Sequence, residues 1–343
     1  MNDATEGAML VDAAARLFAA PPALDPRAKP GAWRADYWAA VCQLGLPLAL
    51  VDRARGGLGQ AAQQALRIVV LTGQYAVPLP LAETMIANQA LAGAGLPLAE
   101  GPAAIVPNGV TLTREGSGWR AAGTAVRVPW GGDVTTLVVE AEGCIIRLTS
   151  GWKVDSHNVS AAGMVRDTLA IDAAASAADV AVTCGPGLLL GGATIRTLQM
   201  AGAVGRMVDL TAAHVRDRMP FGRTAAKLPA IEHRLERAAE QAVATLAAAD
   251  MAVDGWAALP APRPLPISAA RVRAGDAVRD AITICQQVHS AIGSTQPDSL
   301  QPYSAALLGW RDEYGGDVYW SRILGQAALA ATPKGYWSFL NAA

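Results

Sequence analysis

Apolar and polar residues recur at helical spacing through the first hundred residues, in segments that glycines and prolines separate. Residues three and four positions apart share one face of an α-helix, so this pattern predicts amphipathic helices. The predicted helices cover residues 33–44, 60–75 and 81–92. Gly45, Pro78 and Pro80 lie between these segments, and residues of these types end helices. We therefore expect an N-terminal helical domain over residues 1–100.

The pattern changes from about residue 103, where short runs rich in β-branched residues begin. Asn-Gly, Gly-Ser-Gly and Gly-Gly-Asp sequences separate the runs, as is typical of turns between strands. The predicted strands cover residues 110–113, 119–121, 125–128, 134–140, 144–149, 168–171 and 180–183. Short strands at this spacing predict a small antiparallel barrel or sandwich, and we assign this β-domain to residues 101–184.

Helical spacing returns after Gly187 and continues to the end of the chain. One apolar stripe consists of Met200, Val204, Val208, Thr211 and Val215. The other faces of this segment are also largely apolar, which is usual for a helix buried among other helices.

Two more long helices and a connector are predicted beyond this segment. One helix covers residues 230–253, and the proline-rich stretch 259–266 is predicted to be a non-helical connector. Ser268 is the expected N-cap of the next helix, and a last helix covers residues 317–331. The predicted fold class is α+β: an N-terminal helical domain, a small antiparallel β-barrel or sandwich domain, and a C-terminal helical bundle over residues 185–343.

Composition narrows the possible functions. The chain has 28 basic and 29 acidic residues, so no charge excess favours nucleic acid or an anionic membrane surface. No apolar run is long enough to span a membrane, and the first residues lack the pattern of a secretory signal. Four scattered cysteines predict reduced thiols and a cytoplasmic protein, and four dispersed histidines predict no metal site. Phosphate-binding loops and serine-hydrolase elbows are missing from the sequence.

Two short motifs remain as candidates for ligand binding. Arg218 is followed by Phe221 and Gly222 at the end of the long helix, where the arginine offers a phosphate contact and the phenylalanine a packing surface. The alternative is ordinary helix-end chemistry, because cations and glycine are both favoured there. The segment from Gln287 to Gly293 offers polar side chains and a flexible glycine at a second helix end, and the alternative is a capped helix with a polar exit turn.

The order of these motifs resembles that of the acyl-CoA dehydrogenase family along most of the chain. The opening run 37–45, followed by Gly-Gly-Leu-Gly at 56–59, is similar to the beginning of that family, and the run 78–84 resembles the stretch that follows. Arg218-x-x-Phe221-Gly222 matches the family's Arg-x-x-Phe-Gly, and Gln287 to Gly293 stands where Gln-x-x-Gly-Gly-x-Gly is expected. The likeness is to short bacterial members, and especially to the less complete subunit of heteromeric acyl-CoA dehydrogenases.

The resemblance implies an FAD cofactor, extended between the β-domain and the C-terminal helices at a subunit interface. Arg218 would contact the FAD pyrophosphate, Phe221 would pack against the cofactor, and Gly222 would permit the turn beneath it. Gln287 and the backbone near Gly293 would hold the adenosine part of a neighbour's FAD. The implied reaction is α,β-dehydrogenation of an acyl-CoA thioester, for which the protein positions a carboxylate base.

The sequence departs from the family at several of these places. A Thr-Glu-Pro…Gly-Ser-Asp run is missing from the β-domain, and the Gly-Gly pair is Ser290-Ala291. Pro297 stands where a glutamate often follows. Added β-carbons at 290 and 291 are expected to crowd a phosphate that approaches the backbone closely.

The catalytic base is the most serious departure. One branch of the family places it at the position of Gly192, and the other places it near Tyr314. The neighbouring Glu313 is a candidate only if the register slips by one residue, and the alternative for Asp312-Glu313 is a solvated helix end.

Two functions therefore stay open from the sequence. The first is an FAD-dependent acyl-CoA dehydrogenase that forms a homodimer or homotetramer. The second is a non-catalytic or cofactor-completing partner subunit of a hetero-oligomer with a paralogous dehydrogenase. Both predict that the chain associates, because a flavin at an interface needs at least two subunits.

Overall fold

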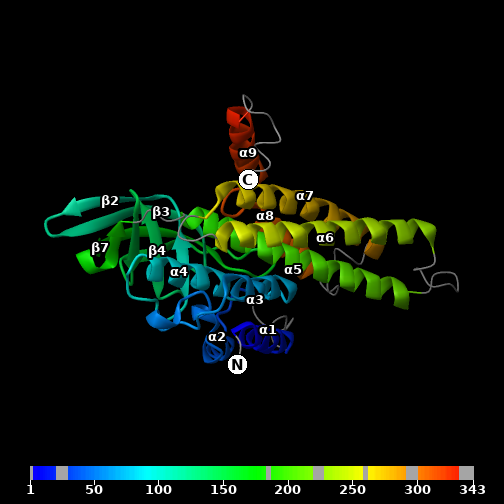
Figure 1. Ribbon diagram of the computed structural model, residues 1–343, viewed down its shortest axis with the longest axis horizontal. Helices are drawn as coiled ribbons and strands as arrows, with labels where there is room; N and C mark the ends of the chain where they lie inside the picture. The colour runs from blue at the N-terminus through cyan, green and yellow to red at the C-terminus, as the bar shows by residue number, and fades with distance from the viewer. Residues whose placement is uncertain are drawn as a thin grey trace.

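The structure, a computed structural model, describes residues 3–20, 30–182, 187–218, 228–257, 262–290 and 300–331. Figure 1 shows strands gathered at one end of an elongated molecule and long helices running from them to the other end. Helix α9 points away from the long axis, beside α7. The predicted α+β class, with helical regions on both sides of a β region in the sequence, is confirmed.

The N-terminal region consists of four α-helices and two short 3₁₀ turns. The helices are α1 (Asp3–Ala19), α2 (Ala35–Gln43), α3 (Ala62–Gln74) and α4 (Leu81–Gly93), and the turns are η1 (Leu46–Leu48) and η2 (Arg53–Arg55). The three predicted helices are confirmed, whereas α1 was not predicted. Gly45 follows α2 with a φ of 70°, a left-handed conformation that glycine adopts without steric cost.

The β region contains two four-stranded sheets. The strands are β1 (Ala103–Val106), β2 (Val110–Glu115), β3 (Gly118–Pro129), β4 (Thr136–Ala141), β5 (Cys144–Leu148), β6 (Trp152–Ser156), β7 (Arg166–Ala175) and β8 (Val180–Val182), with η3 (Ala177–Asp179) before the last. The sheet orders are β1-β4-β5-β8 and β2-β3-β7-β6, so the described strands form a sandwich and no closed barrel. The predicted antiparallel sandwich is confirmed for most strand pairs, and β1 and β4 pair in parallel.

The first sheet is buried on both faces, which places the β region against the helices. One face of this sheet packs against the second sheet through residues such as Leu137 and Val139. The opposite face carries Val138 and Ile145, which belong to the core of the helices. Successive side chains of a strand point to opposite faces, so alternate residues of β4 serve two different cores. The first sheet is therefore a middle layer between the helices and the second sheet, and the second sheet is the outer layer.

The C-terminal region is a helical bundle. Its helices are α5 (Leu188–Asp217), α6 (Pro229–Ala257), α7 (Pro264–His289), α8 (Gln301–Asp312) and α9 (Asp317–Ala331). The prediction that Ser268 caps α7 is wrong, because α7 begins at Pro264 and the Ser268 hydroxyl donates to the Pro264 carbonyl oxygen. Proline fits the first turn of a helix, where its missing N–H would lack a partner anyway.

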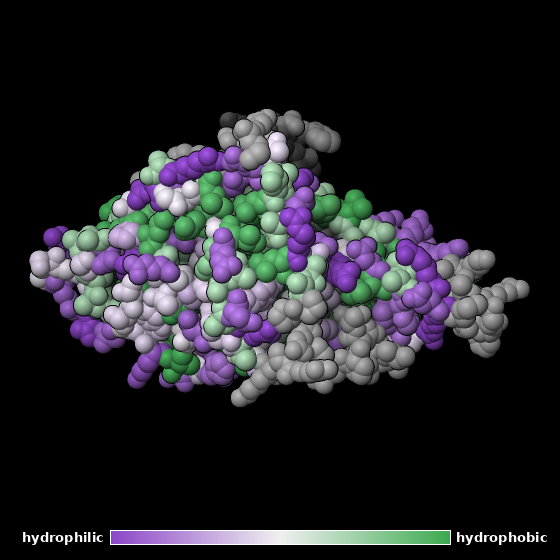
Figure 2. Space-filling view, turned by 90° about the horizontal axis from the view of Figure 1, so that it is seen from below, coloured by the Kyte–Doolittle hydropathy of each residue, from purple (hydrophilic) through white to green (hydrophobic). Residues whose placement is uncertain are grey.

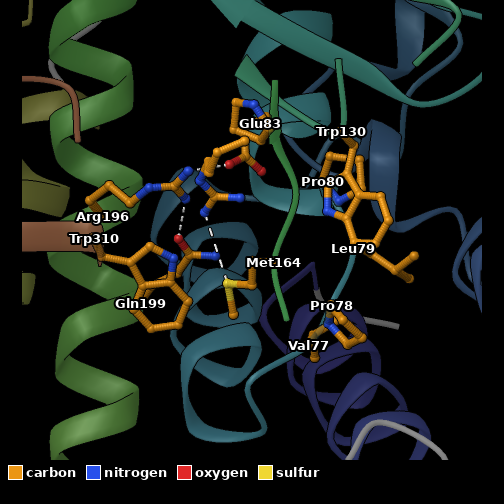
Figure 3. A pocket seen from close by; sticks show the side chains of 12 residues that line it. Val77, Pro78, Leu79, Pro80, Glu83, Trp130, Met164, Arg196, Gln199 and Trp310 are labelled. Carbon is orange, nitrogen blue, oxygen red and sulfur yellow. Dashed lines mark hydrogen bonds and ion pairs between the residues drawn. The ribbon is translucent and has the colours of Figure 1, made fainter. Parts of the chain in front are cut away.

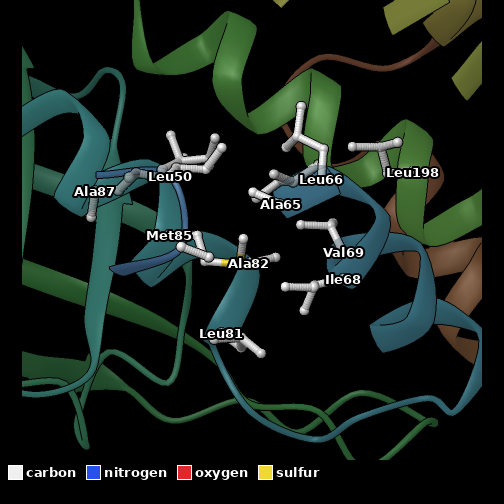
Figure 4. Close-up of a cluster of buried hydrophobic side chains, with 14 of the residues drawn as sticks. Leu50, Ala65, Leu66, Ile68, Val69, Leu81, Ala82, Met85, Ala87 and Leu198 are labelled. Atoms are coloured by element: carbon white, nitrogen blue, oxygen red, sulfur yellow. The ribbon is translucent and has the colours of Figure 1, made fainter. Parts of the chain in front are cut away.

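The N-terminal helices and the C-terminal bundle share one hydrophobic core. Leu66 and Val69 of α3, Met85 of α4 and Leu198 of α5 meet there (Figure 4). Helices α3 and α5 approach so closely that a β-carbon at Gly202 would lie 2.0 Å from the carbonyl oxygen of Val70. The division into domains at residues 100/101 and 184/185 stays a prediction, since this core crosses both boundaries.

Candidate functional site

A buried arginine lies where α4, α5 and the segment after α8 meet. Arg196 of α5 is 1% exposed. Its guanidinium donates to Glu83 of α4 and to Gln199 one turn further along α5 (Figure 3). It also donates to Glu313 Oε2 at 2.7 Å. Burial alone would lower the pKa of Arg196, but attraction from Glu313 and Glu83 outweighs it and raises the pKa above its ordinary value. Arg196 is therefore a fixed cation between two carboxylates.

A second arginine completes the contacts of Glu313. Arg166, at the start of β7, donates through Nε to Glu313 Oε1 at 2.6 Å. Glu313 is 7% exposed, so the interpretation of this residue as part of a solvated helix end is wrong. Burial raises the pKa of Glu313, but attraction from Arg166 and Arg196 and their hydrogen bonds lower it by more. The pKa of Glu313 is therefore below its ordinary value. Glu313 is therefore an anion whose two oxygens are both occupied.

The backbone around Glu313 is held by a third buried arginine. Arg271 of α7 donates through Nη2 to the carbonyl oxygens of Trp310, Arg311 and Glu313 at 2.8, 2.6 and 3.1 Å. These are carbonyls at the end of α8, which have no partner within the helix. Burial lowers the pKa of Arg271 to about 10, so the side chain is a cation at neutral pH. Arg271 thus fixes the connection from α8 to α9.

The side chain of Tyr314 occupies the space beside Gly192. A β-carbon at Gly192 would lie 2.3 Å from Cγ of Tyr314. The guanidinium carbon of Arg196 lies 5.1 Å from the centre of the tyrosine ring, within the range of a cation–π interaction. Burial raises the pKa of Tyr314 above its ordinary value, although Arg196 opposes the shift. The hydroxyl is therefore neutral, and it is buried without a hydrogen-bond partner among the described residues.

The space between these groups is almost filled by protein. The cavity drawn in Figure 3 measures about 10 Å³ and is bordered by Glu83, Arg166 and Arg196, with Trp130 and Trp310 nearby. A volume of this size holds about one water molecule. The charged residues here pair with one another, and the cavity offers no room for an organic ligand.

Tyr314 borders a second, larger cavity. It measures about 270 Å³ and is bordered by the turn after β1, the end of β3, the first residues of α5 and the segment from Asp312 to Gly315. Asp312 and Glu313 are the carboxylates that border it. Glu313 forms ion pairs with Arg166 and Arg196. Asp312 forms no ion pair with the described residues, so it is the unpaired carboxylate at this cavity.

The two helix-end motifs lie at one end of the bundle. His214 and His289 stack with ring centres 4.1 Å apart, and they belong to the last turns of α5 and α7. Arg218 follows His214 by one turn and is exposed, and Gln287 precedes His289 and is exposed as well. Phe221, Gly222 and Gly293 lie outside the described residues.

Sequence reasoning missed the arginines and Glu83 that organise this site. Glu83 is the single charged residue of α4, and Arg196 is the single charged residue in the part of α5 from 188 to 205. A charge on a buried helix needs an oppositely charged partner, so an isolated charge in an apolar helical segment predicts a buried ion pair. In the described ranges, no helix is long and apolar enough to cross a membrane, and no group of three or more acidic, histidine or cysteine side chains is arranged to hold a metal ion.

Comparisons with known proteins point to the acyl-CoA dehydrogenases. Residues 189–308 match the family described as acyl-CoA dehydrogenase, C-terminal domain. The acyl-CoA dehydrogenase IpdE2 of Mycobacterium tuberculosis is 26% identical over 303 residues, covering 87% of this chain and 83% of that protein. IpdE2 of Mycolicibacterium smegmatis is also 26% identical, covering 80% of this chain and 84% of the relative. The chain thus resembles the acyl-CoA dehydrogenase family, through its C-terminal helices in the family match and over most of its length in these relatives.

Solved structures share the acyl-CoA dehydrogenase fold over nearly the whole chain. A variant of the steroid ACAD Tcur3481-Tcur3483 is 19% identical with a TM-score of 0.83, covering 96% of this chain and 100% of that one. The ChsE4-ChsE5 complex from Mycobacterium tuberculosis is also 19% identical, with a TM-score of 0.76 and coverages of 97% and 98%. Butyryl-CoA dehydrogenase from Megasphaera elsdenii is 14% identical with a TM-score of 0.79, covering 94% and 98%.

Proposed function

We propose that this acyl-CoA dehydrogenase family member is a non-catalytic, cofactor-completing subunit of a hetero-oligomeric acyl-CoA dehydrogenase. The contact between Gly192 and Tyr314 carries the proposal. The resemblance places a catalytic carboxylate at one of these two positions, and in the fold the two positions touch. One of them has no side chain and the other has a neutral ring.

The neighbouring carboxylate does not replace the missing base. A general base must reach the substrate proton through a free oxygen, and its pKa works best when it lies near the operating pH. Both oxygens of Glu313 accept bonds from arginines, and its pKa is held below the ordinary value. Both properties disfavour proton abstraction by Glu313.

The opposite end of the bundle fits a part of FAD. A pyrophosphate is bound well by a cation with several hydrogen-bond donors, such as arginine. Adenosine is bound by amide side chains or backbone groups. The exposed side chains of Arg218 and Gln287 offer these groups at one end of the bundle. In this proposal Arg218 holds the pyrophosphate of one FAD and Gln287 the adenosine of a neighbour's FAD, and the resemblance assigns Phe221, Gly222 and Gly293 to the same cofactor. FAD, when bound, supplies the hydride acceptor. This chain's residues bind and orient it for a site that the partner completes.

The relatives and the surface support association. Two of the similar structures are named for pairs of proteins, Tcur3481 with Tcur3483 and ChsE4 with ChsE5. Apolar residues form a patch across the middle of the face shown in Figure 2, between polar margins. Large apolar side chains are also exposed on two helices, Val243 and Leu246 on α6 and Val318 and Leu329 on α9. By this analogy the partner is a paralogous dehydrogenase, and the substrate is a steroid-type acyl-CoA.

A working FAD-dependent dehydrogenase is the second candidate. The cavity of about 270 Å³ beside Tyr314 favours it, because Asp312 borders the cavity and is exposed. In this case the chain alone would carry out α,β-dehydrogenation as a homo-oligomer. The free thiols Cys42, Cys144 and Cys285 agree with a cytoplasmic location in either case.

The test compares the purified chain, a paralogous dehydrogenase and their co-expressed complex. Flavin absorbance and acyl-CoA-dependent bleaching of the flavin are measured for each. We expect the complex to hold FAD and to be bleached, and the chain alone to show neither at unit stoichiometry. Arg218→Ala is expected to lower the flavin content of the complex by about tenfold or more, because charged hydrogen bonds contribute about 1.5–3 kcal/mol.

Arg216→Ala is the matched control, since Arg216 is an exposed arginine in the last turn of the same helix. Its flavin content should stay close to that of the unchanged complex. A chain that binds one FAD by itself and is bleached by an acyl-CoA would refute the partner-subunit proposal and establish the second candidate.

A further inference from the structure

We propose that the cavity beside Tyr314 binds a carboxylate on the acyl part of an acyl-CoA, with Arg127 as the receptor. The inference rests on the proposed function for the acyl-CoA and adds the charge of the acyl group. The cavity lies between the end of β3 and the segment that contains Tyr314, and Arg127 borders it.

Arg127 is held in an unusual backbone conformation. The pairing of β3 with β7 shifts between Ala125 and Val128, so Val126 and Arg127 form a bulge. The φ of Arg127 is 57°, in the left-handed region that residues other than glycine, asparagine and aspartate seldom adopt. Bulges re-aim side chains at the margins of sheets and beside sites. Arg127 is one of the two bulged residues, and it borders the cavity.

A second strained residue borders the same cavity. Tyr314 has a φ of 51° and borders the cavity together with the two bulged residues of β3. Strained residues persist only where the surroundings over-determine them, and they gather at binding sites. Arg271 supplies that constraint for the segment of Tyr314, through its three bonds to the backbone. Two separate elements thus hold strained residues at one cavity.

The guanidinium of Arg127 is available to a ligand. The side chain is exposed and has no hydrogen bond or ion pair among the described residues, unlike Arg166 and Arg196. Of the two carboxylates at the cavity, Glu313 is compensated by those two arginines. Asp312 is the remaining anion, and it disfavours a second negative charge close to it. Arg127 is the cation at the cavity that can attract one.

The other residues that border the cavity favour an apolar ligand group. Ile105, Val106, Val128 and Leu189 present apolar side chains, and Asn108 adds an amide. At about 270 Å³ the cavity is close to the lower limit of small-molecule sites and admits one end of a larger ligand. An apolar chain or ring with a terminal carboxylate matches this combination, because an arginine binds a carboxylate through two parallel hydrogen bonds.

The test uses adipyl-CoA and hexanoyl-CoA, which share a six-carbon chain and differ by a terminal carboxylate. Equilibrium binding of each ester is measured by calorimetry on the full-length chain and on its complex with a paralogous dehydrogenase. We expect adipyl-CoA to bind about tenfold or more tightly than hexanoyl-CoA, in line with the contribution of a charged hydrogen bond. Arg127→Asn should abolish this preference and leave hexanoyl-CoA binding unchanged, since asparagine tolerates a positive φ.

Two further variants sharpen the result. Arg127→Lys keeps the charge and should retain a reduced preference, whereas Asp312→Asn should strengthen adipyl-CoA binding. Equal affinities for the two esters, a preference that survives Arg127→Asn, or no binding of either ester would overturn the proposal. This experiment measures affinity and not turnover. The partner-subunit proposal is tested separately, and it fails if the chain alone binds FAD and an acyl-CoA reduces that flavin.

Discussion

Gly192 of α5 and Tyr314 of the α8–α9 connection are in direct contact, and a β-carbon on the glycine would lie 2.3 Å from Cγ of the tyrosine. The ring thus takes the place that a side chain at position 192 would need. The two positions at which the resemblance to acyl-CoA dehydrogenases would place the base are therefore neighbours in this fold. Neither of them holds a carboxylate here.

This contact predicts strong coupling between the two positions. Gly192→Ala should lower the free energy of unfolding by about 1–3 kcal/mol, because it forces a methyl group into a filled space. In the background of Tyr314→Ala the same change should cost much less, since the ring is gone. Urea unfolding of the two single variants and the double variant measures the coupling. Additive effects would show that the two residues do not touch.

The paired carboxylate of Glu313 predicts a large loss of stability on neutralisation. Glu313→Gln leaves Arg166 and Arg196 without a shared anion, and breaking a buried pair in this way costs about 3–5 kcal/mol. Asp312→Asn is the control, because Asp312 is exposed and its change should stay within about 0.5 kcal/mol. Both are measured by chemical unfolding at pH 7. Equal effects of the two variants would contradict the buried network.

The same carboxylate predicts how stability depends on pH. The pKa of Glu313 is lower in the folded chain than in the unfolded chain, where a glutamate titrates at about 4.3. Its contribution is therefore present above about pH 4.3 and is lost as the pH falls through the folded pKa. The stability difference between the unchanged chain and Glu313→Gln should be constant near neutral pH and shrink below about pH 4.3. A difference that grows on acidification would reverse the sign of the shift.

The crossing of α3 and α5 predicts a sharp contrast between two glycines of one helix. Gly202→Ala places a β-carbon 2.0 Å from the Val70 carbonyl oxygen and should destabilise the chain by about 3 kcal/mol or more. A β-carbon at Gly205 would meet no atom of the described residues within 4 Å. Gly205→Ala should therefore be neutral or stabilise by up to about 1 kcal/mol through helix propensity. Thermal unfolding distinguishes the two, and a harmless Gly202→Ala would mean that the helices lie further apart.

Local spacing along the chain was enough to predict most of the elements. The helices α2, α3, α4 and α9 and most strands follow from periodicity, because the side-chain pattern of an element reflects the face that it buries. Strand β6 was missed because four of its five residues are exposed, so it has no apolar alternation. The proline-rich start of α7 was misread because the same proline that ends a helix also fits its first turn.

The sequence by itself determined the resemblance to acyl-CoA dehydrogenases and the lack of a carboxylate at positions 192 and 314, since both depend on which residue stands at which point of an ordered set of motifs. Only the tertiary structure decided that these positions meet, and that Glu313 is buried between two arginines. Arg196 and Glu313 are 117 positions apart, and Arg166 comes from a third element. Such pairings depend on how helices and sheets pack, and packing is set by the whole core and not by spacing along the chain.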